Sequence, residues 1–386
     1  MVKHSSRIFL KQSALKSNFN FLRKKVGDGV RISSVVKANA YGHGIETFVP
    51  MAEKCGINHF STASAFEAEE VLNVCSPDSK IMIMGILYDD DMPWAIANDI
   101  EFYVYNYDKL TKALAAAKKI GKPAHIHVEV ETGANRTGMN AKEFTKTLTF
   151  LKKNKAHLIF EGLCTHFGGA ESLSNQFKID SQHKKYKEFL KECKTKKLLP
   201  NYRHIASSAA ALALKDTVYD MVRVGVAQYG FWPSPDIYYL HLQETGKKAD
   251  GNALKRIFNW KTDIMDIRYV DAGEFIGYGT AFQATQDMKV AVMPLGYSNG
   301  YPRALSNRGQ VLIGGKKAPI VGLINMNLFM VDISHIPDVN VGDEVVLVGR
   351  QGKQLINIAS FTNFTQLLNN EMLSRLPAAI PREAIK

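Results

Sequence analysis

Long apolar runs and targeting signals are missing from the sequence. Hydrophobic residues occupy 46% of its 386 positions, but no stretch of about 18 consecutive apolar residues occurs, so we expect no transmembrane helix. Residues 1–10 include Lys3 and Arg7 but lack the apolar core and small-residue cleavage site of a signal peptide. We therefore predict a cytoplasmic protein without membrane contact.

Cysteine is scarce and dispersed. The four cysteines are Cys55, Cys75, Cys164 and Cys193. They form no CxxC pair and have no metal-ligand spacing, so we expect neither a disulfide framework nor a metal site. Buried free thiols in a reducing compartment are the simplest interpretation.

Nucleotide-binding signatures are absent as well. No GxxxxGK[ST] occurs, and no GxGxxG follows a strand and opens a helix, so neither a nucleotide-hydrolase loop nor a dinucleotide fold is indicated. The formal net charge is +12, and lysines are densest between Lys178 and Lys197. Aromatic residues are not interleaved there in a nucleic-acid-binding pattern. We interpret the segment as a solvated helix face and expect no nucleic-acid partner.

Between about residues 14 and 230, β-type runs alternate with helical patterns. Eight strand–helix steps in order predict a parallel sheet and favour a closed (βα)8 TIM-type barrel over a doubly wound open sheet. The strand candidates are Arg31–Lys37, Ile57–Thr62, Lys80–Met84, Ile100–Tyr105, Ala124–Val130, Leu158–His166, Tyr202–Ala206 and Asp220–Val226. The helix candidates are Ala14–Val26, Ala65–Leu72, Tyr107–Ile120, Ala141–Lys153 and Phe177–Lys194.

After Pro235 the pattern changes. Residues 243–255 are polar and predict a linker or surface insertion. Strand-like segments separated by turns follow from Phe258 onward and predict a mostly antiparallel β domain. We therefore place a barrel domain at residues 1–243 and a C-terminal β domain at residues 244–386.

Reactive side chains follow several barrel strands where those strands end. Lys37, Arg136, His166 and Arg223 each stand at or just after the carboxyl end of a predicted strand. Each alone has a bland interpretation as a surface or core residue, but the carboxyl ends of barrel strands share one rim, where active sites form. Poor solvation at such a rim lowers the pKa of a lysine, so Lys37 is a candidate nucleophile.

Two further segments fit an anion. Ser207 and Ser208 follow the seventh predicted strand, and Gly225 and Val226 follow the eighth. Hydroxyls, N–H groups and a glycine that permits close backbone approach suit a phosphate, although the serines also fit an ordinary helix N-cap. In the β domain, Tyr278 stands between two glycines, where a plain β-turn is the alternative.

Taken in order, segments spread over nearly the whole chain resemble the alanine racemase family. Their order and spacing match as well, which is more specific than any single motif. The matching segments are VVKANAYGHG at 35–44, TGANRTGM at 132–139, THFGGAE at 165–171, ASSAA at 206–210, VRVGVAQYGFWPSP at 222–235, IGYGTAF at 276–282, PLGYSNGYPRALSN at 294–307 and GLINMN at 322–327.

The resemblance implies a homodimer that depends on pyridoxal 5′-phosphate (PLP). It implies that Lys37 forms the Schiff base with PLP and serves as one base, while Tyr278 reaches across from the other subunit as the opposite base. Arg223 is expected to contact the pyridine nitrogen, with His166 supporting it. The residues expected to hold the phosphate are Tyr41, Ser208, Gly225 and Val226.

The same resemblance implies an amino-acid substrate. Arg136 is expected to contact the substrate carboxylate and the phenolate side of PLP, and Tyr297 and the Met326 N–H are expected to place the substrate from the partner chain. PLP is an electron sink that makes an α-proton removable, and racemisation needs a base on each face. The related PLP decarboxylases have an acidic residue at the place of Arg223, which favours a racemase here.

Three positions depart from the family pattern. Glu129 stands where the family often has a lysine carbamate that orients the arginine, so we expect its carboxylate to take that role directly. Asn327 replaces an aspartate, and Ala378 replaces a tyrosine that narrows the entrance. We predict racemisation of alanine for peptidoglycan. A racemase of serine or of broader specificity, a decarboxylase and a degenerate PLP-binding regulatory protein are the alternatives.

Overall fold

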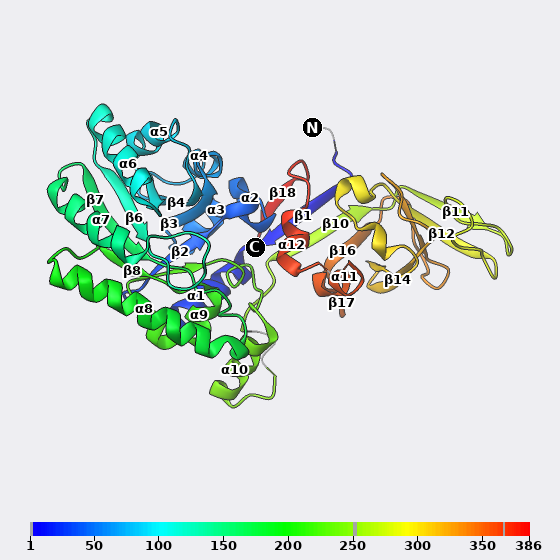
Figure 1. Cartoon of the computed structure of the whole chain (residues 1–386). Helices are drawn as coiled ribbons and strands as arrows, with labels where there is room; N and C mark the ends of the chain where they lie inside the picture. Colours follow the sequence, from blue (N-terminus) through cyan, green and yellow to red (C-terminus); the bar gives the residue numbers. More distant parts are fainter. Residues whose placement is uncertain (1–2, 250–252, 366) are drawn as a thin grey trace. The chain divides into compact units, whose positions relative to one another are not determined.

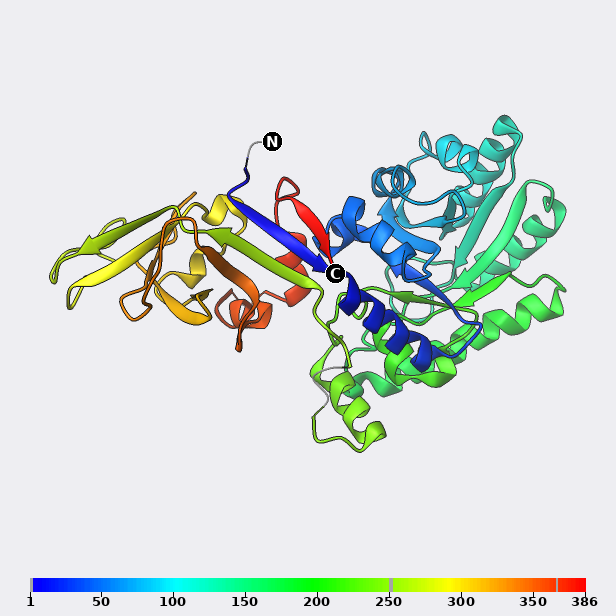
Figure 2. The same ribbon diagram turned by 180° about the vertical axis from the view of Figure 1, so that it is seen from behind.

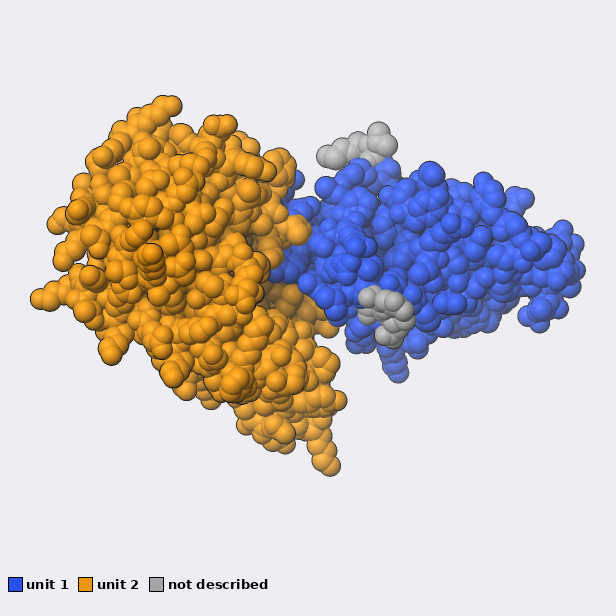
Figure 3. All heavy atoms as spheres, viewed as in Figure 1, with its two compact units in different colours: residues 1–12, 39–48, 257–386 blue, residues 13–38, 49–256 orange. Residues whose placement is uncertain are grey.

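The computed structural model describes residues 3–249, 253–365 and 367–386, which form two compact units (Figure 3). We call them the barrel unit and the β unit. The barrel unit comprises Ser13–Ala38 and Val49–Arg256, and the β unit comprises Met1–Gln12, Asn39–Phe48 and Ile257–Lys386.

The barrel unit is built on eight parallel strands in the order β8-β7-β6-β5-β4-β3-β2-β9. The N–H of Asp220 donates to the Arg203 carbonyl at 3.1 Å, and such bonds join the last strand to β8 and bring the two ends of the sheet together. All eight predicted strands are confirmed. Their bounds are β2 Arg31–Val35, β3 His59–Ser64, β4 Lys80–Ile86, β5 Glu101–Val104, β6 Ala124–Glu129, β7 Leu158–Cys164, β8 Tyr202–His204 and β9 Met221–Val224.

Helices lie on the outer side of these strands (Figures 1 and 2). The sequence determines several of their ends. The Asn106 side chain caps α6 by accepting from the Lys109 N–H, and Gly121 ends that helix in the left-handed conformation. The helices up to residue 245 are α1 Gln12–Val26, α2 Lys37–Tyr41, α3 Ile45–Glu53, α4 Ala65–Leu72, α5 Met92–Ala97, α6 Tyr107–Ile120, α7 Ala141–Lys153, α8 Gln176–Thr195, α9 Ser208–Ala213 and α10 Pro235–Thr245.

The β unit contains a mostly antiparallel sheet in the order β11-β12-β15-β14-β13-β16-β10-β1-β18, with β17 paired to β16. This confirms the predicted class of the C-terminal region. Its strands are β1 Ser6–Lys11, β10 Phe258–Asp263, β11 Asp266–Val270, β12 Met288–Met293, β13 Gln310–Ile313, β14 Lys316–Val321, β15 Phe329–Asp332, β16 Glu344–Gln351, β17 Gln354–Ile356 and β18 Arg382–Ile385, and its short helices are α11 Ile358–Thr365 and α12 Asn369–Ser374.

The two units do not follow the single border that we expected at residue 243/244. Strand β1 belongs to the β unit because Ile8 pairs with Trp260 of β10 and with Arg382 of β18. Its alternating pattern buries Ile8 and Leu10 completely. At the other border, the barrel unit extends to Arg256, since the Asn18 side chain holds the Lys255 backbone through both its carbonyl and its N–H.

Part of the segment expected to be a polar linker is helical. α10 runs to Thr245, and Gly246 caps it with φ of 66°; residues 250–252 lie outside the described part. All four cysteines are free thiols, and Cys75 alone is not fully buried. Among the described residues, no helix is both long and apolar enough to cross a membrane.

Candidate active site

Lys37 stands at the start of a left-handed turn. Strand β2 ends at Val35, and α2 follows with φ between 52° and 54° at Ala38, Asn39, Ala40 and Tyr41. This corrects our expectation that the strand runs to Lys37. Left-handed helical backbone costs about 1–2 kcal/mol per non-glycine residue. Such strain next to a candidate reactive residue is typical of functional sites.

Bonds within the barrel unit fix the backbone on either side of Lys37. The Val35 carbonyl accepts from the Tyr229 hydroxyl at 2.9 Å, and the Ala38 N–H donates to the Glu67 carboxylate at 2.6 Å. Water reaches the Lys37 side chain, so its desolvation is only partial. Even so, surrounding protein atoms and then the charge of Arg136 lower its pKa, against the opposing effect of Glu67. The lowered pKa fits the predicted nucleophile.

Arg136 lies in an exposed loop that follows β6. The Thr132 hydroxyl contacts the Thr165 hydroxyl at 2.9 Å, which ties this loop to the segment after β7. Gly138 has φ of 117°, and a Cβ there would meet the Val130 and Glu131 backbone, so the tight loop needs a glycine. The Arg136 guanidinium has no hydrogen bond or ion pair with any described residue. It is therefore available to an anionic ligand.

Glu129 ends β6 and is buried. Burial raises the pKa of its carboxyl, while a hydrogen bond with Thr137 and the charges of Arg136 and Arg223 act in the opposite direction. Within the described residues, no direct ion pair joins Glu129 to Arg136. The charge of Arg136 thus acts on the Glu129 carboxyl, and the orienting contact we expected is absent from the described structure.

Arg223 sits at the end of β9 with 5% of its surface exposed. Its Nη1 donates to His204 Nδ1 at 2.7 Å and to the His204 carbonyl at 2.8 Å, and its Nη2 donates to the Thr165 carbonyl at 2.8 Å and, at 3.4 Å, to the Ile205 carbonyl. No described residue accepts from its Nε–H. That group is therefore free to donate to a ligand.

His204 supports Arg223 in the place where we expected His166. No hydrogen bond between His166 and Arg223 occurs among the described residues. His204 escaped the sequence analysis because it lies inside the seventh strand candidate, Tyr202–Ala206, in a polar context, YRH, with no motif around it. Its position at the end of β8, next to the strand carrying Arg223, was the available signal.

His166 remains part of the same rim through electrostatics. Burial, followed by the charges of Arg223, Arg136 and Lys37, lowers its pKa to about 3. The imidazole is therefore neutral at neutral pH, and three cations converge on it. This concentration of positive charge fits a ligand that carries a phosphate and a carboxylate.

The expected phosphate segment is formed by α9 and the residue after β9. The Gly225 N–H donates to Ser208 Oγ at 2.9 Å, so it is engaged within the protein, while the Ser208 hydroxyl hydrogen stays available. Ser207 is the N-cap of α9, and its buried Oγ has no partner among the described residues. A buried hydroxyl without a partner is costly, and a phosphate oxygen would satisfy it. These residues and the free Arg223 Nε–H fit PLP.

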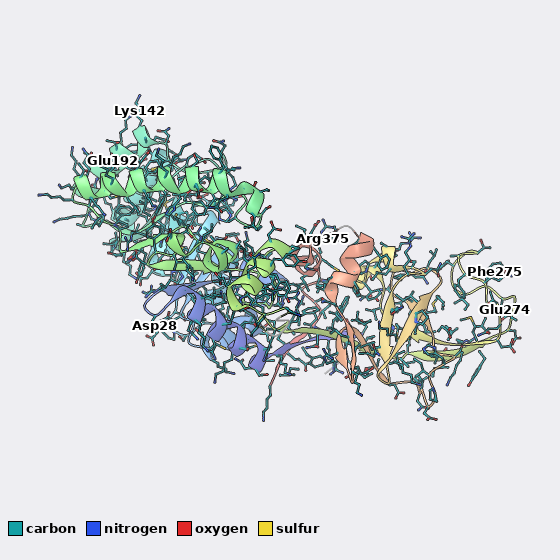
Figure 4. All side chains as sticks on the ribbon, turned by 90° about the horizontal axis from the view of Figure 1, so that it is seen from below. Asp28, Lys142, Glu192, Glu274, Phe275 and Arg375 are labelled. Carbon is teal, nitrogen blue, oxygen red and sulfur yellow. The ribbon has the colours of Figure 1, made fainter. Side chains whose placement is uncertain are left out.

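Tyr278 belongs to the β unit and is 72% exposed. Gly277 and Gly279 flank it with φ of 80° and 67°, so the chain reverses tightly on both sides. The preceding residues Glu274 and Phe275 lie in the loop after β11 (Figure 4). Exposure leaves the Tyr278 hydroxyl free to act on a ligand outside its own loop.

Tyr297 and Met326 come from two neighbouring loops of the β unit and are 43% and 56% exposed. The Tyr297 N–H donates to the Asn325 carbonyl at 3.0 Å, and Met326 O accepts from the Ser298 N–H at 3.0 Å. Asn307 connects the loop that carries Tyr278 to the segment before Met326. Its side chain donates to the Ala281 carbonyl and accepts from the Gly322 N–H. The fold therefore brings the predicted substrate contacts and the Tyr278 loop into one region of this unit.

The remaining expected residues also lie in the β unit. Burial raises the pKa of Tyr41 to about 12, so its hydroxyl stays protonated and can donate to an anion. Asn327 donates to the Ser298 hydroxyl at 2.8 Å. The Ala378 carbonyl accepts from Arg382 at 2.8 Å, and its methyl group is exposed.

Models of two domains of one protein family match most of the chain. Residues 10–233 match the alanine racemase N-terminal domain, and residues 257–384 match the alanine racemase C-terminal domain. An alanine racemase of Leptospira interrogans is 32% identical over 98% of this chain and 95% of its own length. One from Halothermothrix orenii is 33% identical over 96% and 94%.

Solved structures agree with these matches. An alanine racemase from a D-cycloserine-producing Streptomyces lavendulae superimposes with a TM-score of 0.87 at 26% identity, covering 100% of this chain and 98% of the other. An alanine racemase from Bartonella henselae with covalently bound pyridoxal phosphate gives 0.81 at 25% identity, covering 99% and 100%. The likeness thus extends over both units.

Proposed function

Because the chain belongs to the alanine racemase family, which is PLP-dependent, we propose that it interconverts L- and D-alanine with Lys37 and Tyr278 as its two proton carriers. The observation that carries the proposal is the environment of Arg223. Its guanidinium is held by four hydrogen bonds and retains one free N–H. Arginine donates and cannot accept a proton, so a ring nitrogen facing it stays unprotonated.

This choice of residue limits side reactions. PLP, when bound, supplies an electron sink that makes the α-proton of an amino acid removable. By donating to the ring nitrogen, Arg223 would leave it unprotonated, which would weaken this sink and limit transamination. An acid at the position of Arg223 would favour the decarboxylase alternative, and neither that alternative nor a regulatory protein is favoured by the relatives found.

Lys37 and Tyr278 would transfer protons on opposite faces of the substrate. Lys37 Nζ has a lowered pKa, which makes its neutral, proton-accepting form more accessible. A single base tends to return the proton to the face from which it came. The Tyr278 hydroxyl is exposed and free of protein partners among the described residues, so we assign it the opposite face.

Anion binding holds the reacting groups in place. Ser207 and Ser208 hydroxyls suit the phosphate, and we keep Tyr41, Gly225 and Val226 as further predicted contacts. The uncommitted guanidinium of Arg136 suits the substrate carboxylate. Tyr297 and Met326 would then border the substrate from the β unit.

Tyr278 is assigned to the site of a partner subunit, which requires a homodimer. Mixing Lys37→Ala and Tyr278→Phe chains should restore one intact site in each heterodimer, so activity should reappear in a mixture of two inactive proteins. Each variant refolded alone is the control. If the mixed sample stays as inactive as the parents, the two residues do not act across subunits.

The activity itself is tested by following D-alanine formation from L-alanine in the PLP-loaded protein. L-Serine and larger L-amino acids are run in parallel, because the exposed Ala378 and Asn327 bear on specificity. A higher kcat/KM for serine than for alanine would favour the racemase of serine or of broader specificity.

Supply of D-alanine for peptidoglycan and a cytoplasmic location remain predictions. Deletion of the gene should create a requirement for D-alanine.

A further inference from the structure

A continuous line of hydrogen bonds runs from Arg223 through the interior of the barrel. Arg223 contacts His204, whose Nε2 lies 2.8 Å from His127 Nδ1, and His127 Nε2 lies 2.7 Å from Glu101 Oε2. The imidazoles are fully buried, and Glu101 is 5% exposed. The proposed catalytic scheme uses only the first member of this line.

The direction of every bond in the line is forced by chemistry. A guanidinium only donates, so His204 Nδ1 accepts and carries no hydrogen. A neutral His204 then has its hydrogen on Nε2 and donates to His127 Nδ1. By the same logic, His127 donates from Nε2 to Glu101. Two neutral imidazoles therefore connect a buried cation to a buried carboxylate with all donors pointing the same way.

A second branch of hydrogen bonds reaches the same oxygen. His59 Nε2 lies 3.2 Å from Glu101 Oε2, and His59 Nδ1 lies 2.8 Å from the Ser33 hydroxyl. The Ser33 hydroxyl in turn contacts that of Ser61. His59 thus donates to Glu101 and accepts from Ser33. The carboxylate is the common acceptor for both branches.

Charge explains why the line ends on a carboxylate. Burial alone would raise the pKa of Glu101, but the hydrogen bonds from His127 and His59 outweigh it and hold that pKa well below its ordinary value. Arg223 has no carboxylate within ion-pair distance among the described residues. A buried, unpaired charge is unfavourable, so Glu101 balances the charge of Arg223 through the two imidazoles.

The backbone leaves space for this arrangement. A Cβ at Gly162 of β7 would overlap His127 Nδ1 and approach His204 Nε2 to 2.7 Å, which is where their mutual hydrogen bond runs. The φ of Gly162 is not positive, so the glycine is required by the imidazole pair and not by backbone conformation.

We propose that Glu101 is a positioning residue for the racemase reaction, which acts through His127 and His204 to fix the charge and the direction of the Arg223 guanidinium. The inference rests on the proposed function, because Arg223 matters for catalysis only as the partner of the cofactor ring. Removing the carboxylate charge weakens the hold on the guanidinium without changing any residue that touches the ligand.

The hydrogen-bond direction is tested first, without any need for activity. Proton–nitrogen correlation spectra of the PLP-loaded protein labelled with ¹⁵N-histidine report which ring nitrogen carries the hydrogen. His204→Asn and His127→Asn variants serve to assign the signals. We expect both residues as neutral Nε2–H tautomers. A hydrogen on His204 Nδ1, or an imidazolium at either position, would overturn the relay.

The functional consequence is tested with Glu101→Gln, which keeps the shape and removes the charge. Glu161→Gln is the matched control, since Glu161 pairs with His125 at 2.7 Å in the same barrel but has no link to Arg223. We expect kcat for alanine to fall about 10-fold or more in Glu101→Gln, with little change in KM. The visible absorption of the bound cofactor should shift relative to wild type, and Glu161→Gln should match wild type in all three.

Equal kcat, KM and visible absorption in Glu101→Gln and Glu161→Gln would contradict the proposal. Glu101→Asp, which retains the charge, should recover part of the lost kcat, and its failure to exceed Glu101→Gln would also count against a charge effect. If wild-type protein does not racemise alanine, the proposed function fails, whereas the nitrogen spectra still decide whether the relay exists.

Discussion

The two units position their reactive residues by different means. In the barrel unit, Arg223 is nearly enclosed and satisfied by strand-end carbonyls and a histidine. In the β unit, Tyr278 is exposed between two glycines, and its side chain has no hydrogen bond with any residue that the structure describes. A group that must keep one charge is thus buried and bonded. A group that meets a ligand from outside is left accessible.

Among these variants, loss of Lys37 in the barrel unit should lower the racemase activity most. Lys37→Ala removes both the attachment point and one proton carrier, so we expect kcat to fall by about 10⁴-fold or more. After borohydride reduction, which converts a lysine imine into a stable secondary amine, PLP should no longer remain with the denatured variant. Racemase assays and absorbance of the denatured, filtered protein measure this. Retained covalent PLP would show that another lysine holds it.

Loss of the Tyr278 hydroxyl should separate chemistry from cofactor binding. Tyr278→Phe should lower kcat by about 10³-fold, while the PLP content and visible absorption stay at wild-type values because the barrel unit is unchanged. Solvent-deuterium incorporation into L- and D-alanine should become unequal, since one face loses its proton carrier. Equal incorporation from both enantiomers would contradict the assignment of opposite faces.

Adding a methyl group in each unit compares how tightly they are packed. Gly162→Ala pushes against two buried imidazoles, and we expect it to lower the free energy of unfolding by about 2–3 kcal/mol. Gly277→Ala meets only the end of the Met330 side chain, at 2.6 Å, at a φ of 80°, so about 1–2 kcal/mol is expected. Urea titrations measure both. A larger loss for Gly277→Ala would reverse the comparison.

Acid should weaken the barrel unit through the neutral imidazole of His166. The folded state holds the pKa of His166 at about 3, below its ordinary 6.5, so the unfolded chain takes up a proton first as pH falls. Stability from this group is therefore present above pH 6.5 and is lost as pH falls from 6.5 toward 3. Thermal unfolding of PLP-free His166→Gln should show a weaker decline over this window than wild type does.

Much of the barrel could be predicted from the sequence because its strands carry apolar runs separated by helical patterns. The rule that strand ends share a rim also placed Lys37, His166 and Arg223 in one electrostatic neighbourhood, which the pKa of His166 supports. The sequence did not show that the Glu129 carboxylate lacks a direct ion pair with Arg136 among the described residues. The spacing of charged residues along the chain does not tell whether two side chains touch.

Other features depend on tertiary contacts that a local pattern does not contain. Strand β1 is short and its partners lie more than two hundred residues away. The left-handed turn of Ala38 to Tyr41 contradicts local propensity. His127 and Glu101 were missed because buried polar residues within strands resemble ordinary surface positions until the closed barrel places them side by side.

The hydrogen-bonded line to Glu101 also links the quality of the site to the completion of folding. The line and its branch through His59 and Ser33 draw members from β2, β3, β5, β6, β8 and β9, so the whole network exists only after both the first and the last barrel strands are in place. A nascent chain that ends before β9 would contain Glu101 and three histidines but no guanidinium to balance them. Strand β9, the last barrel strand to be synthesised, thus both closes the barrel and supplies Arg223, the cation that the buried histidines link to Glu101.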